Sequence, residues 1–238
     1  MQGRYYGAPA SILAVLLAFL PQGVALDQPG VEVLVFAAES AGIHLGTLTI
    51  TTAYEGEVVR ITQTIQPSGF LQLVLAPELE WETVLDARTL DLRSMRRHSR
   101  SRFHNEEVTA TVEQGMVRQQ LVNGQVITYA LPPTGLTDDQ GLTYRLRWGA
   151  FPERIYTLAG YGPVVTIGEQ LGEQTVPGPD GPVLAQGFRF RSFLADGTPA
   201  SPAGDTVSGW IQVAEPHLPL RLEFGGPLTI SGWLIAVR

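Results

Sequence analysis

Residues 78–103 read ELEWETVLDARTLDLRSMRRHSRSRF, a stretch with two charge ladders of opposite sign. The acidic ladder consists of Glu78, Glu80 and Glu82, and the basic ladder consists of Arg96, His98, Arg100 and Arg102. Alternate residues of a β-strand share one face of the sheet. A hairpin centred near Thr89 pairs Glu82 with Arg96, Glu80 with His98 and Glu78 with Arg100. The stretch therefore predicts two antiparallel strands in this register, with acid opposite base.

The arginine-rich strand has two open interpretations. Exposed cross-strand ion pairs contribute only about 0.2–1 kcal/mol each, which favours a solvated surface that fixes the register. Alternatively, the guanidinium groups capture an anionic ligand, such as a phospholipid head group or an acidic polysaccharide. The same register places Trp81 opposite Arg97 and Leu85 opposite Arg93, on the other face. Trp81, Arg93 and Arg97 are therefore the candidate ligand-binding residues.

The chain from residue 31 onward consists of short apolar or alternating segments separated by Gly, Pro, Asn and Asp, as is typical of successive antiparallel strands. The predicted strands are 31–37, 43–52, 58–66, 70–75, 79–86, 92–103, 108–113, 116–122, 126–130, 188–194, 207–214, 220–224 and 228–237. Asn123-Gly124 is the strongest hairpin-turn signal. Segment 169–182 is rich in Gly and Pro and is interpreted as a long loop or a loosely paired ribbon.

One short helix is predicted after the break at Pro132-Pro133. Asp138 and Asp139 precede residues 141–148, and an aspartate at this position caps the first turn of a helix. The fold class is therefore mainly β, a curved antiparallel sheet or half-barrel meander with one short helical insert.

The first 25 residues predict a secretory signal peptide. Arg4 supplies the positive charge, residues 12–20 form an apolar run, and Gly23-Val24-Ala25 provides small residues at a cleavage point. The run is far shorter than the roughly 20 residues that span a bilayer. We expect cleavage after Ala25, which leaves residues 26–238 as a single β-rich domain without a transmembrane anchor, in the periplasm or outside the cell.

The composition limits the chemistry. Hydrophobic residues make up 44% and charged residues 16% of the 238-residue chain, which favours a folded domain. The net charge of −7 argues against a nucleic-acid partner. The absence of cysteine excludes thiolate nucleophiles, iron–sulfur clusters and most structural zinc sites.

No catalytic, cofactor or metal signature emerges from the sequence. The string G-x-S-x-G of a nucleophile elbow and the zinc motif H-E-x-x-H are both missing. His104 with Glu106 and Glu107 is interpreted as a charged loop rather than a metal site. Asp138 and Asp139 are better explained as a helix cap than as a glycosidase pair. The sequence thus predicts no catalytic residue, no cofactor and no metal ligand.

Short segments along most of the chain resemble an uncharacterised family of exported bacterial proteins, a domain of unknown function. They are residues 42–48, Asp86 before Thr89-Leu90, Asp138-Asp139 with residues 144–147, and Trp210 ahead of residues 219–221. The family's shape is similar to that of the periplasmic carriers of lipoproteins. The resemblance implies a strongly bent antiparallel sheet whose concave face is partly closed by a short helix, and it favours a periplasmic location.

The leading hypothesis is a non-enzymatic periplasmic protein that binds a hydrophobic or amphiphilic, lipid-like ligand, or an envelope partner, on the concave face of the sheet. One alternative is an envelope glycan or ester hydrolase whose site the linear sequence does not reveal. Another is an interaction module that adds a partner's strand to a sheet edge.

Overall fold

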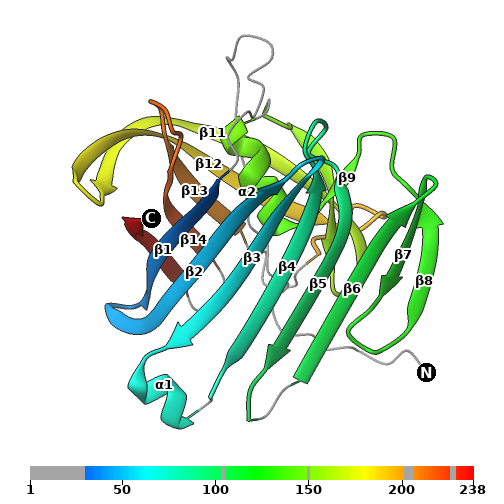
Figure 1. Cartoon of the computed structure of the whole chain (residues 1–238), viewed down its shortest axis with the longest axis horizontal. Helices are drawn as coiled ribbons and strands as arrows, with labels where there is room; N and C mark the ends of the chain where they lie inside the picture. Colours follow the sequence, from blue (N-terminus) through cyan, green and yellow to red (C-terminus); the bar gives the residue numbers. More distant parts are fainter. Residues whose placement is uncertain (1–29, 75, 103–104, 149–150, 201–205, 226–228) are drawn as a thin grey trace.

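All strands of the computed structural model belong to one continuous sheet (Figure 1). The structure describes residues 30–74, 76–102, 105–148, 151–200, 206–225 and 229–238, so the predicted signal peptide lies outside the described residues. The strand order is β8-β7-β6-β5-β4-β3-β2-β1-β15-β14-β13-β12-β11-β10-β9. All neighbouring strands are antiparallel except β9 and β10, which are parallel. The predicted class, a curved antiparallel sheet with a short helical insert, is confirmed.

The elements follow one another with short connections. The strands of the first half are β1 (Val31–Ser40), β2 (Ile43–Glu55), β3 (Val58–Pro67), β4 (Glu78–Asp86), β5 (Leu92–Arg100), β6 (Asn105–Glu113), β7 (Met116–Gln120) and β8 (Val126–Ala130). The strands of the second half are β9 (Leu136–Thr137), β10 (Arg154–Ala159), β11 (Gly162–Gly178), β12 (Gly181–Phe193), β13 (Thr206–Gln212), β14 (Pro219–Gly225) and β15 (Ile230–Val237). The helices are α1 (Gly69–Val74) and α2 (Asp139–Trp148). Neither of them has the length and apolar character needed to cross a bilayer.

Helix α2 lies inside the curve of the sheet (Figure 1). Its residues from Asp139 to Tyr144, together with Leu146 and Arg147, are buried. Asp138 is the predicted cap, because its Oδ1 accepts a hydrogen bond from the Gly141 N–H at 2.8 Å. Side chains from many strands close around the helix. The largest fully buried side chains of the strands include Phe36, Phe188, Phe190, Leu85, Leu136, Ile155 and Leu220, and Leu142 and Leu146 of α2 pack among them.

A seam without strand pairing lies near the two ends of the sheet, between β7 with the loop after it and the turn between β10 and β11. Gln119 on the inner face of β7 donates a 2.6 Å hydrogen bond to the carbonyl of Ala159, and the Val122 N–H donates a 2.9 Å bond to the carbonyl of Gly160. A Cβ atom on Gly160 would lie 3.3 Å from both Arg97 Nη2 and Glu106 Oε1. The inner face of β5–β7 therefore lies against the turn between β10 and β11.

One prediction about a single segment is wrong, and the structure decides between the two interpretations of another. Residues 70–75 were predicted as a strand, whereas Gly69–Val74 forms α1. A short apolar run with leucines at spacings of two and four fits a helix turn as well as a strand, and Pro67 ends the preceding strand. Segment 169–182 is not a loop, because β11 and β12 pair from Val165 and Phe193 to Gly178 and Gly181. The ribbon interpretation of that segment is the correct one.

The β4–β5 hairpin has the predicted register at its open end. Glu82 lies opposite Arg96, Glu80 opposite His98, Glu78 opposite Arg100 and Trp81 opposite Arg97. The register shifts between Val84 and Leu85, so Leu85 lies opposite Leu92 and the predicted pair of Leu85 with Arg93 is wrong. An extra residue in β5 makes this β-bulge, which returns Leu92 to the core and turns Arg93 outward.

Candidate ligand-binding site

Trp81 and Asp138 fasten α2 to the sheet. Trp81 Nε1 donates a 3.0 Å hydrogen bond to Asp138 Oδ2, and Thr83 Oγ1 donates to the same oxygen. Asp138 has no exposed surface. Burial raises the pKa of this carboxyl, although the hydrogen bonds from Thr83, Gly141 and Trp81 act in the opposite direction. The group is a structural anchor for the helix inside the sheet.

Arg97 lies beside Trp81 and faces the seam. Its guanidinium carbon is 5.4 Å from the centre of the Trp81 ring, and its Nη2 is 3.3 Å from Glu106 Oε1. The Arg97 side chain is only 10% exposed, and its Nε has no hydrogen-bond partner among the described residues. The structure therefore brings two of the three predicted binding residues together on the concave side.

Arg93 lies apart from that pair. Its side chain is 43% exposed, and its Nη2 donates a 2.7 Å hydrogen bond to Asp86, the last residue of β4. This bond, with those from the backbone N–H groups of Thr89 and Arg88, lowers the pKa of Asp86 to about 2. Arg93 holds the hairpin turn, on the side of the sheet away from Trp81 and Arg97.

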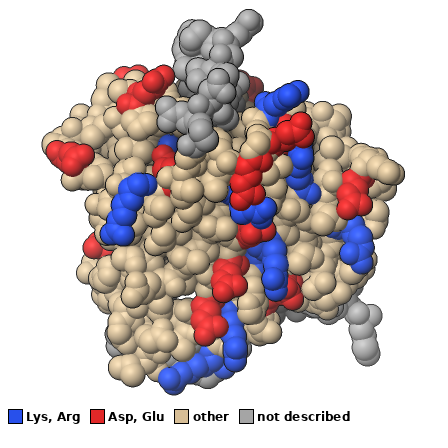
Figure 2. All heavy atoms as spheres, in the orientation of Figure 1, with Lys and Arg blue, Asp and Glu red and all other residues tan. Residues whose placement is uncertain are grey.

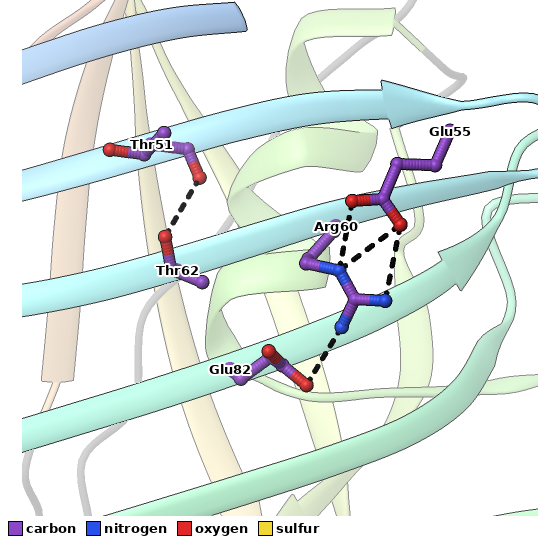
Figure 3. A network of polar contacts seen from close by, with 5 residues as sticks. All are labelled: Thr51, Glu55, Arg60, Thr62 and Glu82. Atoms are coloured by element: carbon purple, nitrogen blue, oxygen red, sulfur yellow. Dashed lines mark hydrogen bonds and ion pairs between the residues drawn. The ribbon is translucent and has the colours of Figure 1, made fainter.

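The charge ladders lie on the outer face of the sheet, but their ion pairs differ from the predicted ones. Arg60 of β3 contacts Glu55 through its Nε and Nη2 and Glu82 through its Nη1, at 2.9–3.2 Å (Figure 3). Arg96 pairs with Glu107 at 3.0 Å instead of with Glu82. Acidic and basic side chains alternate over this face and form no single-sign patch (Figure 2). The solvated-surface interpretation fits this pattern.

The concave face contains a row of partly exposed apolar side chains that the sequence did not single out. Leu48, Ile65 and Leu79, called the apolar row, lie on β2, β3 and β4, and Leu48 is the direct partner of Ile65. Their row continues through Ser99 of β5, which is the partner of Leu79, to Glu106 of β6, which is the partner of Ser99. This row of side chains is thus apolar on β2, β3 and β4 and polar on β5 and β6.

The neighbouring row on the α2 side is buried. It runs over the same strands, and its residues are Leu34, Ile50, Gln63, Trp81, Arg97 and Val108, each with an exposed fraction of 9% or less. Gln63 accepts a hydrogen bond from Gln140 of α2 at 3.4 Å. The contrast between the rows shows where the cover supplied by α2 ends. The alternation of apolar and polar residues in the sequence identifies the inward-facing side chains. It does not indicate which of them α2 covers.

A groove of about 290 Å³ lies outside the concave face. Its lining consists of Pro177, Gly178, Pro179, Trp233, Leu234 and Ile235. It forms where the end of β11 meets β15, and Val176, Ala185 and Trp210 belong to the hydrophobic core. Trp210 is thus a core residue, whereas Trp233 lines the groove. None of the lining residues titrates near neutral pH.

Metal-ligating side chains do not gather in the described part of the chain. Within residues 30–238, apart from the undescribed gaps, no group of three or more His, Asp or Glu side chains is placed to hold a metal ion. His104, named with Glu106 and Glu107 in the sequence analysis, lies outside the described residues.

Comparisons with known proteins provide information about the fold of this chain and not about its function. No family model and no curated protein matches this chain. A crystal structure of a beta-barrel-like protein of the domain of unknown function DUF1849, from Brucella abortus, is 12% identical, with a TM-score of 0.57 over 96% of this chain and 99% of the other.

Two further solved structures show weaker likeness. A protein from Bacteroides fragilis described as exported, with a YmcC-like fold, is 12% identical, with a TM-score of 0.33 over 87% of this chain and 95% of the other. MucB in complex with MucA(peri) is 11% identical, with a TM-score of 0.18 over 87% and 93%. These two scores are too low to show a shared fold. The first structure confirms the expected resemblance to a domain of unknown function, at the level of the fold.

Proposed function

We propose that this protein is exported to the periplasm and binds a hydrophobic or amphiphilic, lipid-like ligand on the apolar row of its concave face. One observation carries the proposal: Leu48, Ile65 and Leu79 are apolar, face inward and stay partly exposed. An inward face is where a sheet normally buries its apolar side chains, so an accessible strip there marks a place for a ligand.

The chemistry of the row favours an amphiphile. Apolar groups of the ligand gain about 25 cal/mol for each Å² of apolar surface removed from water. Ser99 and Glu106 lie next along the row and offer hydrogen-bond partners for a polar head group. Trp81 and Arg97 form the floor between the row and α2 in this proposal, and Arg93 takes no part because it faces outward.

The periplasmic location rests on the sequence. The basic residue, apolar run and small residues at positions 1–25 have the order of a signal peptide, and a chain without cysteine folds independently of the oxidising conditions there. Fractionation of cells that produce the full chain tests this part. Recovery of the shortened protein from the cytoplasm alone would contradict it.

Native mass spectrometry with lipid extraction tests ligand binding directly. Residues 26–238, purified from the periplasm without detergent, are expected to carry a stoichiometric amphiphile. Leu79→Glu places a charge in the apolar row and should remove the bound species. Leu73→Glu is the matched control, because Leu73 of α1 is 73% exposed, and it should retain the species.

Circular dichroism of both variants checks that they fold. An empty wild-type protein would count against the proposal. So would a folded Leu79→Glu variant with as much bound amphiphile as the Leu73→Glu control.

A further inference from the structure

Strand β8 forms one end of the sheet and has one neighbour, β7. The opposite end is β9, which has two residues, both completely buried, and leads directly into α2. The two ends of the sheet thus differ: β9 is covered, whereas Val126, Thr128 and Ala130 of β8 are exposed. Of these two end strands, β8 is the one with a useful length for a partner.

The register with β7 shows which backbone groups of β8 point away from the sheet. The Leu121 N–H donates to the Gln125 carbonyl, and the Leu131 N–H donates to the Gly115 carbonyl, both at 2.8 Å. Hydrogen-bonded and non-hydrogen-bonded pairs alternate along an antiparallel ladder. Ile127 and Tyr129 therefore bond to β7.

The N–H and C=O groups of Val126, Thr128 and Ala130 consequently face the free edge. In the described part of the chain, no backbone hydrogen bond outside the strand ladders uses these groups. They form a template for an additional strand.

The usual protection of an edge strand is missing from β8. Residues 126–130 read VITYA, without charge or proline, and the antiparallel pairing with β7 runs through all five residues without a bulge. Natural sheets commonly protect such an edge with lysine, proline or a bulge. An edge without these features fits a strand that has a partner.

We infer that β8 binds an extended peptide segment of another protein by strand addition, and that the segment has uncharged β-branched residues around a central acidic residue. The acid follows from Arg118, which is exposed on β7, lies opposite Thr128 and has no ion pair with another described residue. A peptide residue opposite Thr128 lies two strand spacings from Arg118, so their backbones are about 10 Å apart. The side chains of a glutamate and of Arg118 are together long enough to bridge this distance.

A second copy of this chain fits the edge less well. Two β8 strands paired antiparallel would place Thr128 opposite Thr128 and would bring no acid to Arg118. Five residues on each side also bury far less than the roughly 1,200 Å² of a stable interface between subunits. The edge therefore suits a short peptide with the complementary charge.

The probe is a terminally blocked nonapeptide of alternating threonine and valine with a central glutamate, and amide hydrogen exchange is the readout. The amides of Val126, Thr128 and Ala130 should exchange quickly in the free protein and slowly with the peptide. Ile127 and Tyr129 serve as controls within the same strand, because their amides should be protected in both states. Protection of the three outward amides in the dilute free protein would overturn the inference.

Two variants and two altered peptides make the test specific. Thr128→Pro removes one outward N–H without touching a bond to β7, and it should weaken binding about tenfold. Arg118→Glu leaves the backbone intact and should reverse the preference, so that a lysine-centred peptide binds better. A peptide whose backbone amides facing β8 are N-methylated cannot donate hydrogen bonds to β8, so it should not bind. Equal binding of that peptide, or concentration-dependent protection without any peptide, would refute strand addition by a peptide.

Discussion

Asp138 connects a helix and a sheet through one carboxylate without exposed surface. It caps α2 through the Gly141 N–H and accepts hydrogen bonds from Trp81 and Thr83 of β4. Asp138→Ala removes the cap and leaves two buried donors without an acceptor, so we expect a loss of about 3 kcal/mol in the free energy of unfolding. Urea denaturation measures it. Asp180→Ala, at an exposed position, should change stability by less than about 0.5 kcal/mol, and equal losses would refute the role of Asp138.

Asp86 makes stability depend on acid. Its pKa is lowered to about 2 in the folded state by Arg93 and two backbone N–H groups, whereas the ordinary value is 3.8. A lowered folded-state pKa contributes stability above the ordinary pKa, and this contribution is lost as the pH falls from about 4 toward 2. Asp86→Asn keeps an acceptor for the backbone groups but does not titrate. Its unfolding midpoint should fall less steeply than that of the wild type over this pH range, and parallel curves would contradict the assignment.

At the scale of elements, an ion pair between the buried Arg147 and the partly exposed Glu32 attaches the end of α2 to β1. Arg147 donates to both carboxylate oxygens of Glu32 at 2.6 and 2.8 Å and to the His217 carbonyl at 3.1 Å, and its side chain is 3% exposed. Arg147→Met leaves these acceptors unpaired, which should cost about 3 kcal/mol in urea denaturation.

Arg145→Met is the control on the same helix. Arg145 also forms an ion pair, with Asp91 at 2.5 Å, but its side chain is 17% exposed and that of Asp91 is 39% exposed. Water therefore replaces part of the lost interaction, and we expect a loss of about 1 kcal/mol. A larger loss for Arg145→Met than for Arg147→Met would reverse the expected order.

Local patterns in the sequence were sufficient for the hairpins. Alternating charges placed Glu82 opposite Arg96, and Asp138 marked the start of α2, because both features depend on near neighbours in the chain. The bulge at Leu85 and the helix α1 were not predictable in this way. A bulge is often marked by glycine, but Leu92 and Arg93 occupy this one and are common in regular strands. A short apolar run such as residues 70–75 is equally compatible with a helix and with a strand.

The candidate site needed information that the sequence does not contain. Alternation placed Leu48, Ile65 and Leu79 on one face, but where α2 stops covering that face depends on packing between distant segments. Trp81 and Arg97 were found because they are cross-strand partners in a hairpin. Arg93 was misplaced because a single inserted residue reverses the face of its neighbours.

At the scale of the whole molecule, the seam between the sheet ends depends on a glycine. Gly160 lies where a Cβ atom would be 2.5 Å from Val122 Cγ1 and 3.3 Å from both Arg97 Nη2 and Glu106 Oε1. Gly160→Ala should therefore push the two ends apart and cost about 1–3 kcal/mol, as overpacking does elsewhere. Gly209→Ala is the matched control, because a Cβ there meets its nearest neighbour at an ordinary 3.6 Å. Urea denaturation of both variants measures the difference, and equal stability would mean that the ends separate without cost.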